Sequence, residues 1–134
     1  MSAERALAAA LRAAALADGG VAALIGDRFH DEPPPEAVFP YATLGRVEAR
    51  AADAADASAI EHVVTLHVWS RYGGRAEAID CIAALRAALH DAPLAIAGRR
   101  LVLLLATYAD VFRAGDGRTT HGVLRLRAIT EPET

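Results

Sequence analysis

The sequence contains no lysine and a single cysteine, Cys81. One cysteine cannot form a disulfide within the chain, which excludes the small disulfide-stapled folds and favours a reduced compartment. All 14 positive charges are arginine, a usage that we attribute mainly to a GC-rich genome, although arginine also suits ion pairs at protein interfaces. With a formal net charge of −3 and no concentrated basic patch, the composition does not point to a nucleic-acid-binding protein.

Long apolar segments are also lacking. Residues 101–106 form an apolar run as long as any in the chain, and such a run is far too short to span a bilayer. Residues 1–5 include an acid and precede no strongly apolar segment, so we expect no signal peptide. These features predict that a membrane is not among the partners of this protein.

Large apolar side chains are scarce, although apolar residues make up 54% of the chain. Alanine accounts for 33 of them and buries little area, so the core must come from 15 leucines, 9 valines, 6 isoleucines and a few aromatics. A chain of 134 residues has the length of one domain. A monomer with this core would be only modestly stable, and burying apolar surface between subunits would stabilise it. We therefore expect an oligomer.

Sequence patterns of catalytic and metal sites are missing. His62 and His67 lie five apart on a predicted strand, so they point to opposite faces and cannot chelate one metal. Cys81 lies in the middle of a predicted helix, at or beside its buried stripe. The glycines at 73–74 and 115–117 have turn spacing and lack the spacing of a phosphate loop. We predict no catalytic residue, no metal ligand and no cofactor, and hence no enzyme.

Apolar periodicity predicts the order helix, strand, strand, helix, strand, strand. The expected helices cover residues 2–17 and 75–90, and the expected strands cover residues 39–47, 60–71, 99–113 and 119–130. A helical turn at 21–25 and a short strand near Phe29 are also expected, and three prolines at 33–35 break regular structure. Residues 48–58 hold no large apolar side chain, so we expect a mobile loop rather than a short helix. We expect this loop to become ordered when the protein binds a partner.

This order predicts one α+β domain over residues 1–130, with a mostly antiparallel sheet of about four to five strands packed by two helices. Residues 131–134 are expected to be a frayed tail. Alternation on the strands places Val64, Leu66 and Val68 on one face and Arg125 and Arg127 outward. The second helix has an apolar stripe formed by Ile79, Ile82, Leu85 and Leu89.

Five segments in order resemble the family of small phage tail completion, or tail terminator, proteins, including those of phage-like gene transfer agents. They are residues 39–45 (FPYATLG), 66–70 (LHVWS), 74–78 (GRAEA), 89–94 (LHDAPL) and 116–125 (DGRTTHGVLR). The resemblance implies a structural virion protein that forms a ring of six copies at the head-proximal end of the tail tube. Such a ring would end tube polymerisation and join the tail to the head connector.

The partners implied by the resemblance are other copies of the chain, the major tail tube protein and the head–tail connector or stopper protein. DNA would pass through the ring without being recognised by sequence. The implied location is the neck of the virion or gene-transfer-agent particle, and the cytoplasm of the bacterial host during assembly.

Aromatic and arginine side chains concentrate binding energy at interfaces, so under this hypothesis we expect contacts with other subunits or partners from two groups of residues. They are Trp69, Tyr72, Tyr108, Arg125 and Arg127, together with Pro33, Pro34 and Pro35. The alternative is a small ligand-binding or enzymatic dimeric α+β domain, whose pocket would bring together His67, Tyr108 and Arg125. A third possibility is an accessory protein that binds a partner through its arginine-bearing sheet face.

Overall fold

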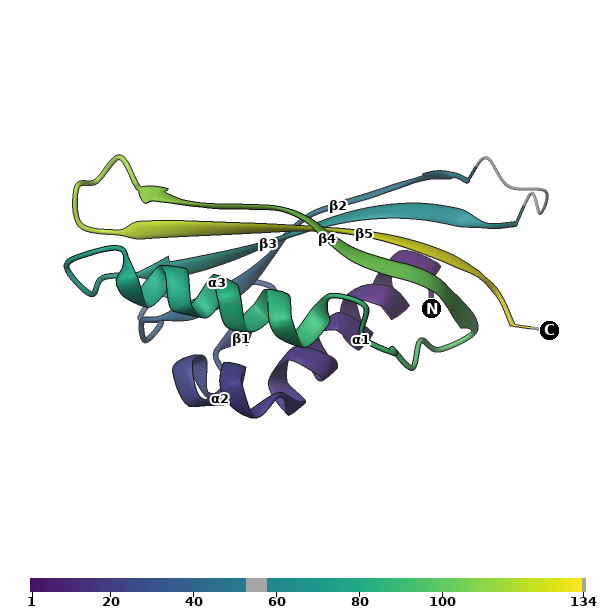
Figure 1. The fold of residues 1–134 in the computed structure, drawn as a ribbon, viewed down its shortest axis with the longest axis horizontal. Coiled ribbons are helices and arrows are strands. Elements are labelled where there is room, and N and C mark those ends of the chain that lie inside the picture. Colours follow the sequence, from purple (N-terminus) through teal and green to yellow (C-terminus); the bar gives the residue numbers. More distant parts are fainter. Residues whose placement is uncertain (53–57, 134) are drawn as a thin grey trace.

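The computed structural model describes residues 1–52 and 58–133. Three helices cover one face of a five-stranded sheet and leave the other face open (Figure 1). The helices are α1 (Ala3–Ala17), α2 (Gly19–Ile25) and α3 (Ala76–Leu89). The strands are β1 (Phe29–His30), β2 (Tyr41–Ala51), β3 (Ile60–Ser70), β4 (Arg99–Arg113) and β5 (Thr120–Pro132). The predicted α+β class is confirmed, with the short α2 as a third helix.

The strand order in the sheet is β1-β2-β3-β5-β4. Only the short β1 runs parallel to its neighbour, β2, and the other three pairs are antiparallel, as predicted. Local sequence explains the helix ends near the N-terminus. The Ser2 hydroxyl accepts a hydrogen bond from the Arg5 N–H, and the Asp18 carboxylate accepts one from the Val21 N–H, so each side chain caps a helix.

The core lies between the helices and the inward face of the sheet. Val64, Leu66 and Val68 of β3 are buried there, as predicted. The predicted stripe of α3 is wrong at Ile79, which is 49% exposed. The buried side of α3 is instead formed by Ala78, Cys81, Ile82, Leu85 and Leu89. Spacings of three and four that start at Ala78 give a continuous stripe, and Ile79 falls beside it.

Strand β4 contains two bulges, which the sequence analysis did not anticipate. The register shifts between Leu101 and Leu103 and again between Ala106 and Tyr108. An inserted residue reverses the alternation of side chains that follow it. Regular alternation along residues 99–113 predicts that Leu101, Leu103 and Leu105 share one face. That prediction is wrong, because Leu101 packs against the core together with Leu104.

Two strands are longer than predicted. β2 continues to Ala51, because residues 48–51 pair with residues 60–63 of β3, so backbone hydrogen bonds hold a segment that lacks apolar anchors. Residues 53–57 of the expected loop lie outside the described residues. β5 continues through Glu131 and Pro132, which pair with Arg100 and Arg99 of β4. Glu131 also forms an ion pair with Arg100, so these two residues of the expected tail belong to the paired strand.

The predicted hairpin turn at 115–117 joins β4 to β5. Gly117 has a φ of 73°, a conformation that favours glycine. The Asp116 carboxylate accepts hydrogen bonds from the Thr119 hydroxyl and from the backbone N–H groups of Thr119 and Arg118. These hydrogen bonds, led by that of the Thr119 hydroxyl, lower the pKa of Asp116 to about 2.

Cys81 is predicted to be chemically inert in the folded protein. It is 1% exposed on the buried side of α3, and burial, followed by the nearby charges of Glu77 and Asp80, raises its pKa to about 11. We expect a thiol reagent at pH 8 to label Cys81 only after unfolding. Complete labelling of native protein within minutes would contradict this expectation.

Candidate interaction surface

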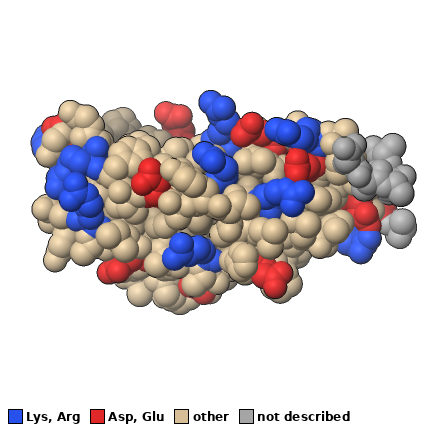
Figure 2. All heavy atoms as spheres, turned by 45° about the horizontal axis from the view of Figure 1, so that its top comes forward, with Lys and Arg blue, Asp and Glu red and all other residues tan. Residues whose placement is uncertain are grey.

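The sheet face opposite the helices, called here the open face, is built by the side chains that alternate away from the core. Cross-strand pairing sets their positions: Trp69 of β3 lies beside Tyr41 of β2 and His121 of β5, and His121 lies beside Phe112 of β4. Arginines and acidic residues are interspersed with uncharged side chains over this side of the molecule (Figure 2). The open face is thus mixed in chemistry.

One part of the open face is a cluster of stacked rings formed by His67, Trp69, Phe112 and His121, called here the ring cluster. The Trp69 and His121 rings stack with centroids 4.0 Å apart, and Phe112 contacts His121 at 4.9 Å. His67 Nδ1 and His121 Nε2 are 2.7 Å apart, so one imidazole donates a hydrogen bond to the other. The Trp69 indole N–H donates to the Thr43 hydroxyl at 3.0 Å. These contacts fix the orientation of each ring.

The environment of the ring-cluster histidines lowers their pKa values and so favours the neutral form. Burial lowers the pKa of His67. Burial also lowers the pKa of His121, the neighbouring His67 lowers it further, and Asp110 opposes the shift. At least one of the two imidazoles must be neutral for this hydrogen bond to form, because two imidazolium groups would offer only donors.

Gly45 gives His67 the room that it occupies. A Cβ atom at residue 45 would lie 2.3 Å from His67 Nε2 and 2.8 Å from the carbonyl oxygen of Thr65. Gly45 lies within the irregularity of β2, where the register with β3 shifts between Leu44 and Val47. The irregular strand and the absence of a side chain at Gly45 together allow the His67 imidazole to lie close to the backbone of β2.

A second part of the open face is a hollow of about 590 Å³, called here the arginine hollow. Arg46, Arg50 and Arg125 line it together with a single acid, Glu48. Arg50 is 3.6 Å from Glu61 of β3. Within the described part of the chain, no acid lies within ion-pair distance of Arg46 or Arg125. The hollow therefore presents an excess of positive charge without a partner.

Four of the residues expected at interfaces meet on the open face: Trp69, Tyr108, Arg125 and Arg127. The Arg125 guanidinium lies over the Tyr108 ring at 4.8 Å, and Tyr108 is 46% exposed. Arg127 is less available, because its Nε donates to the Glu61 carboxylate at 2.6 Å.

The other candidates lie off the open face. Tyr72 is 66% exposed in the turn that follows β3. Pro34 and Pro35 line a separate hollow with Phe39 and Arg71, and Pro33 is half-buried. The Arg71 guanidinium lies over the Phe39 ring at 4.4 Å. The structure thus divides the expected interface residues between two regions of the surface.

His121, Phe112 and Arg46 also belong to this surface, although no sequence pattern predicted them there. The alternation of β5 could have placed His121 on the same face as Arg125, since the two residues are four apart on one strand. Phe112 and Arg46 could not be placed by alternation alone, because each follows a shift of register on its strand.

The alternative hypothesis of a ligand-binding or enzymatic domain has partial geometric support. His67 and Arg125 line the same hollow, with Tyr108 beside Arg125. The hollow lies on an open sheet face, however, and His67 Nδ1 is already hydrogen-bonded to His121.

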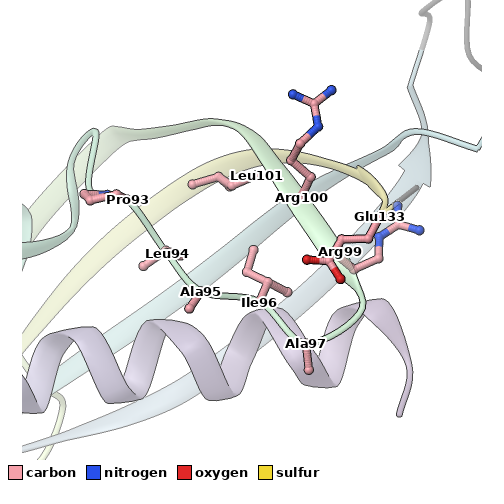
Figure 3. A pocket seen from close by; sticks show the side chains of 9 residues that line it. All are labelled: Pro93, Leu94, Ala95, Ile96, Ala97, Arg99, Arg100, Leu101 and Glu133. Carbon is pink, nitrogen blue, oxygen red and sulfur yellow. The ribbon is translucent and has the colours of Figure 1, made fainter.

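A different hollow of about 610 Å³ lies between residues 93–97 and the start of β4 (Figure 3). Two of its charged groups already have partners: Arg99 donates to Thr130 and to the Ser58 carbonyl oxygen, and Arg100 forms an ion pair with Glu131.

The described residues contain neither a cluster of metal-binding side chains nor a single helix that could cross a membrane. Among the residues described, no group of three or more His, Cys, Asp or Glu side chains could hold a metal ion. No single helix in residues 1–52 and 58–133 is long and apolar enough to cross a membrane, and only α1 and α2 taken together, at an angle of 85°, meet that length and composition.

Comparison with known proteins decides the family. The family model for the tail completion protein gp17 matches residues 9–131, which include most of α1, four complete strands and all of β5 except its last residue. The chain belongs to the tail completion protein family. Its role is therefore that of a structural tail protein, as the resemblance implied.

Two solved structures share the fold of this tail completion protein. One is a chain from the virion of a native gene transfer agent particle, with a TM-score of 0.87 and 30% identity over 97% of this chain and 98% of that one. The other is the gp17 protein of bacteriophage SPP1, with a TM-score of 0.63 and 25% identity over 94% of this chain and 89% of that one. No protein with a curated description matches the sequence significantly.

Proposed function

We propose that copies of this chain close into a ring of six that caps the head-proximal end of a tail tube. The ring would end tube polymerisation and join the tail to the head connector. The observation that carries this proposal is the family match over residues 9–131, together with a fold shared almost end to end with a chain of a gene transfer agent virion. The chain would accordingly reside in the neck of a virion or gene-transfer-agent particle, after assembly in the cytoplasm of the bacterial host.

The surface chemistry supports an assembly function. Three aromatic residues outside the core are between 39% and 66% exposed: Tyr72, Tyr108 and Phe112. Exposed aromatics beside arginines favour protein contacts. Contacts between two different surface regions of the same chain generate a closed ring when the rotation between copies closes, and a closed ring stops growing.

The proposed contacts use the residues identified above. We assign Trp69, Tyr108, Arg125 and Arg127 on the open face, and Tyr72, Pro33, Pro34 and Pro35 off it, to contacts with other subunits, the tail tube protein or the connector. DNA would pass through the opening of the ring without sequence-specific contacts.

The ring is tested by electron microscopy of the purified protein, alone and with tail tubes. We expect annular particles, and we expect cells that lack the gene to accumulate tubes of uncontrolled length without attached heads. A Tyr108→Ala variant is expected to restore fewer joined tails than Ile79→Ala, a matched change of an exposed side chain on α3. Tubes of normal length, joined to heads in the absence of the gene, would contradict the proposal.

A further inference from the structure

Residues 31–36 (DEPPPE) form an exposed acidic segment between β1 and β2. Asp31, Glu32 and Glu36 are exposed, and among the described residues none of them lies within ion-pair distance of a basic side chain. The segment lies outside the sheet, and its three prolines fix three φ angles. A segment restricted in this way loses little conformational entropy when it binds.

The arginine hollow has the complementary properties. It carries three arginines against one acid, and its Arg46 and Arg125 have no acidic partner in the described part of the chain. Tyr108, stacked against Arg125, adds an exposed aromatic ring at its rim. Aromatic side chains commonly bind proline-containing segments, and clustered arginines commonly bind acidic ones. Three unpartnered acids thus match a hollow with two unpartnered arginines.

The segment cannot reach the arginine hollow of its own chain. Residues 31–36 are held between His30, which pairs with Thr43, and Tyr41 at the start of β2. Pro34, Pro35 and Glu36 already line a different hollow, with Phe39 and Arg71. The arginine hollow lies farther along β2, beyond the shift of register that follows Leu44. An occupant with this chemistry must therefore come from another molecule.

We propose that the acidic segment 31–36 of one copy docks in the arginine hollow of the next copy. This inference rests on the proposed ring and names the contact that would hold its subunits together. The contact joins two different regions of the same chain, so each copy gives its segment to one neighbour and receives the segment of the other. The contact depends on opposite charges, so it weakens as salt concentration rises.

Charge reversal tests the pairing. We expect Arg46→Glu/Arg125→Glu and Asp31→Arg/Glu32→Arg/Glu36→Arg each to weaken self-association by about tenfold or more, because like charges then face each other. A chain that carries both sets is expected to regain association, and an equimolar mixture of the two variants is expected to do the same. The control is Arg86→Glu/Arg118→Glu, which reverses two exposed arginines outside the arginine hollow. Association is measured by sedimentation at low salt; failure of the combined chain to recover would overturn the pairing.

A disulfide test separates this inference from the ring itself. Pro35→Cys/Val63→Cys places one thiol in the segment and one in the arginine hollow, and the buried Cys81 stays out of the reaction. Oxidation is expected to give a ladder of covalent oligomers joined by 35–63 disulfides, whereas a chain with cysteines at Pro35 and Ala87 gives no such ladder.

Each outcome of the disulfide test has one meaning. Rings that form without a 35–63 disulfide would overturn the docking contact and leave the proposed function standing. A 35–63 ladder that grows into open filaments would support the contact and overturn the ring. The absence of both oligomers and disulfides would overturn both.

Discussion

Gly45→Ala is expected to destabilise the protein by about 1–3 kcal/mol, the usual cost of forcing an extra group into a packed site. The new Cβ would lie 2.3 Å from His67 Nε2 and 2.8 Å from the Thr65 carbonyl oxygen. The imidazole can rotate away only by losing its 2.7 Å hydrogen bond to His121, and the carbonyl oxygen belongs to the backbone of the central β3. Chemical denaturation measures the loss of stability, and the histidine ring signals in NMR report whether the ring cluster has rearranged.

The matched control is Gly74→Ala, because a Cβ at residue 74 would have no atom within 4 Å. We expect that variant to be as stable as the parent or slightly more so, since alanine restricts the unfolded chain. In a double-mutant cycle, His67→Ala should recover part of the stability lost in Gly45→Ala, because it removes one of the two clashes. Equal stability of Gly45→Ala and the parent would show that the approach of His67 to β2 is not a constraint.

The free energy of unfolding is expected to fall as the pH is lowered from 7.5 to 5.5. Burial lowers the pKa of His62 in the folded protein; the charge of Glu4 opposes this shift and that of Arg99 adds to it. The pKa values of His67 and His121 are also lowered. A group with a lowered folded pKa binds its proton more readily in the unfolded chain. Its contribution to stability is complete above the unfolded value of about 6.5 and is lost as the pH falls below it.

His62 gives this prediction a structural cause. The residue is fully buried; its Nε2 is 2.8 Å from the Thr130 hydroxyl, and its Nδ1 has no hydrogen-bond partner in the described structure. Protonation would add a buried charge and leave an N–H donor without an acceptor. His62→Leu is therefore expected to reduce the slope of stability against pH.

The control for His62→Leu is Val64→Ala at the next inward position of β3, which should lower stability at every pH without changing the slope. Denaturation curves recorded at several pH values measure both variants. An unchanged slope in His62→Leu would assign the pH dependence to other groups.

Much of the fold follows from local patterns. The alternation of Val64, Leu66 and Val68 gives both the strand and its buried face, and the Asp116 turn gives the β4–β5 hairpin. The Ser2 and Asp18 caps mark where two helices begin. These signals act over a few residues, so they can be recognised without knowledge of the rest of the molecule.

The parts that could not be predicted depend on distant neighbours. Nothing local marks the bulges of β4, and each one moves the following side chains to the other face, as with Leu103 and Leu105 after the first bulge. Ile79 is as apolar as Ile82, and only the placement of α3 on the sheet decides which is buried. The ring cluster likewise forms because the register brings His121 of β5 beside Trp69 of β3. Of the residues expected at interfaces, Trp69, Tyr108, Arg125 and Arg127 lie on the open face, and their contacts with partners stay a prediction.

The irregular outer strand of the sheet has a consequence for the supply of subunits in the cell. β4 lies at one edge, where two bulges interrupt its hydrogen-bonding groups and Arg100 and Asp110 add exposed charges. Bulges and charges at a sheet edge hinder the uncontrolled strand-to-strand pairing that leads to aggregation. Copies that are not yet assembled are thereby hindered from joining edge to edge, which leaves contacts between their side chains to decide how they associate.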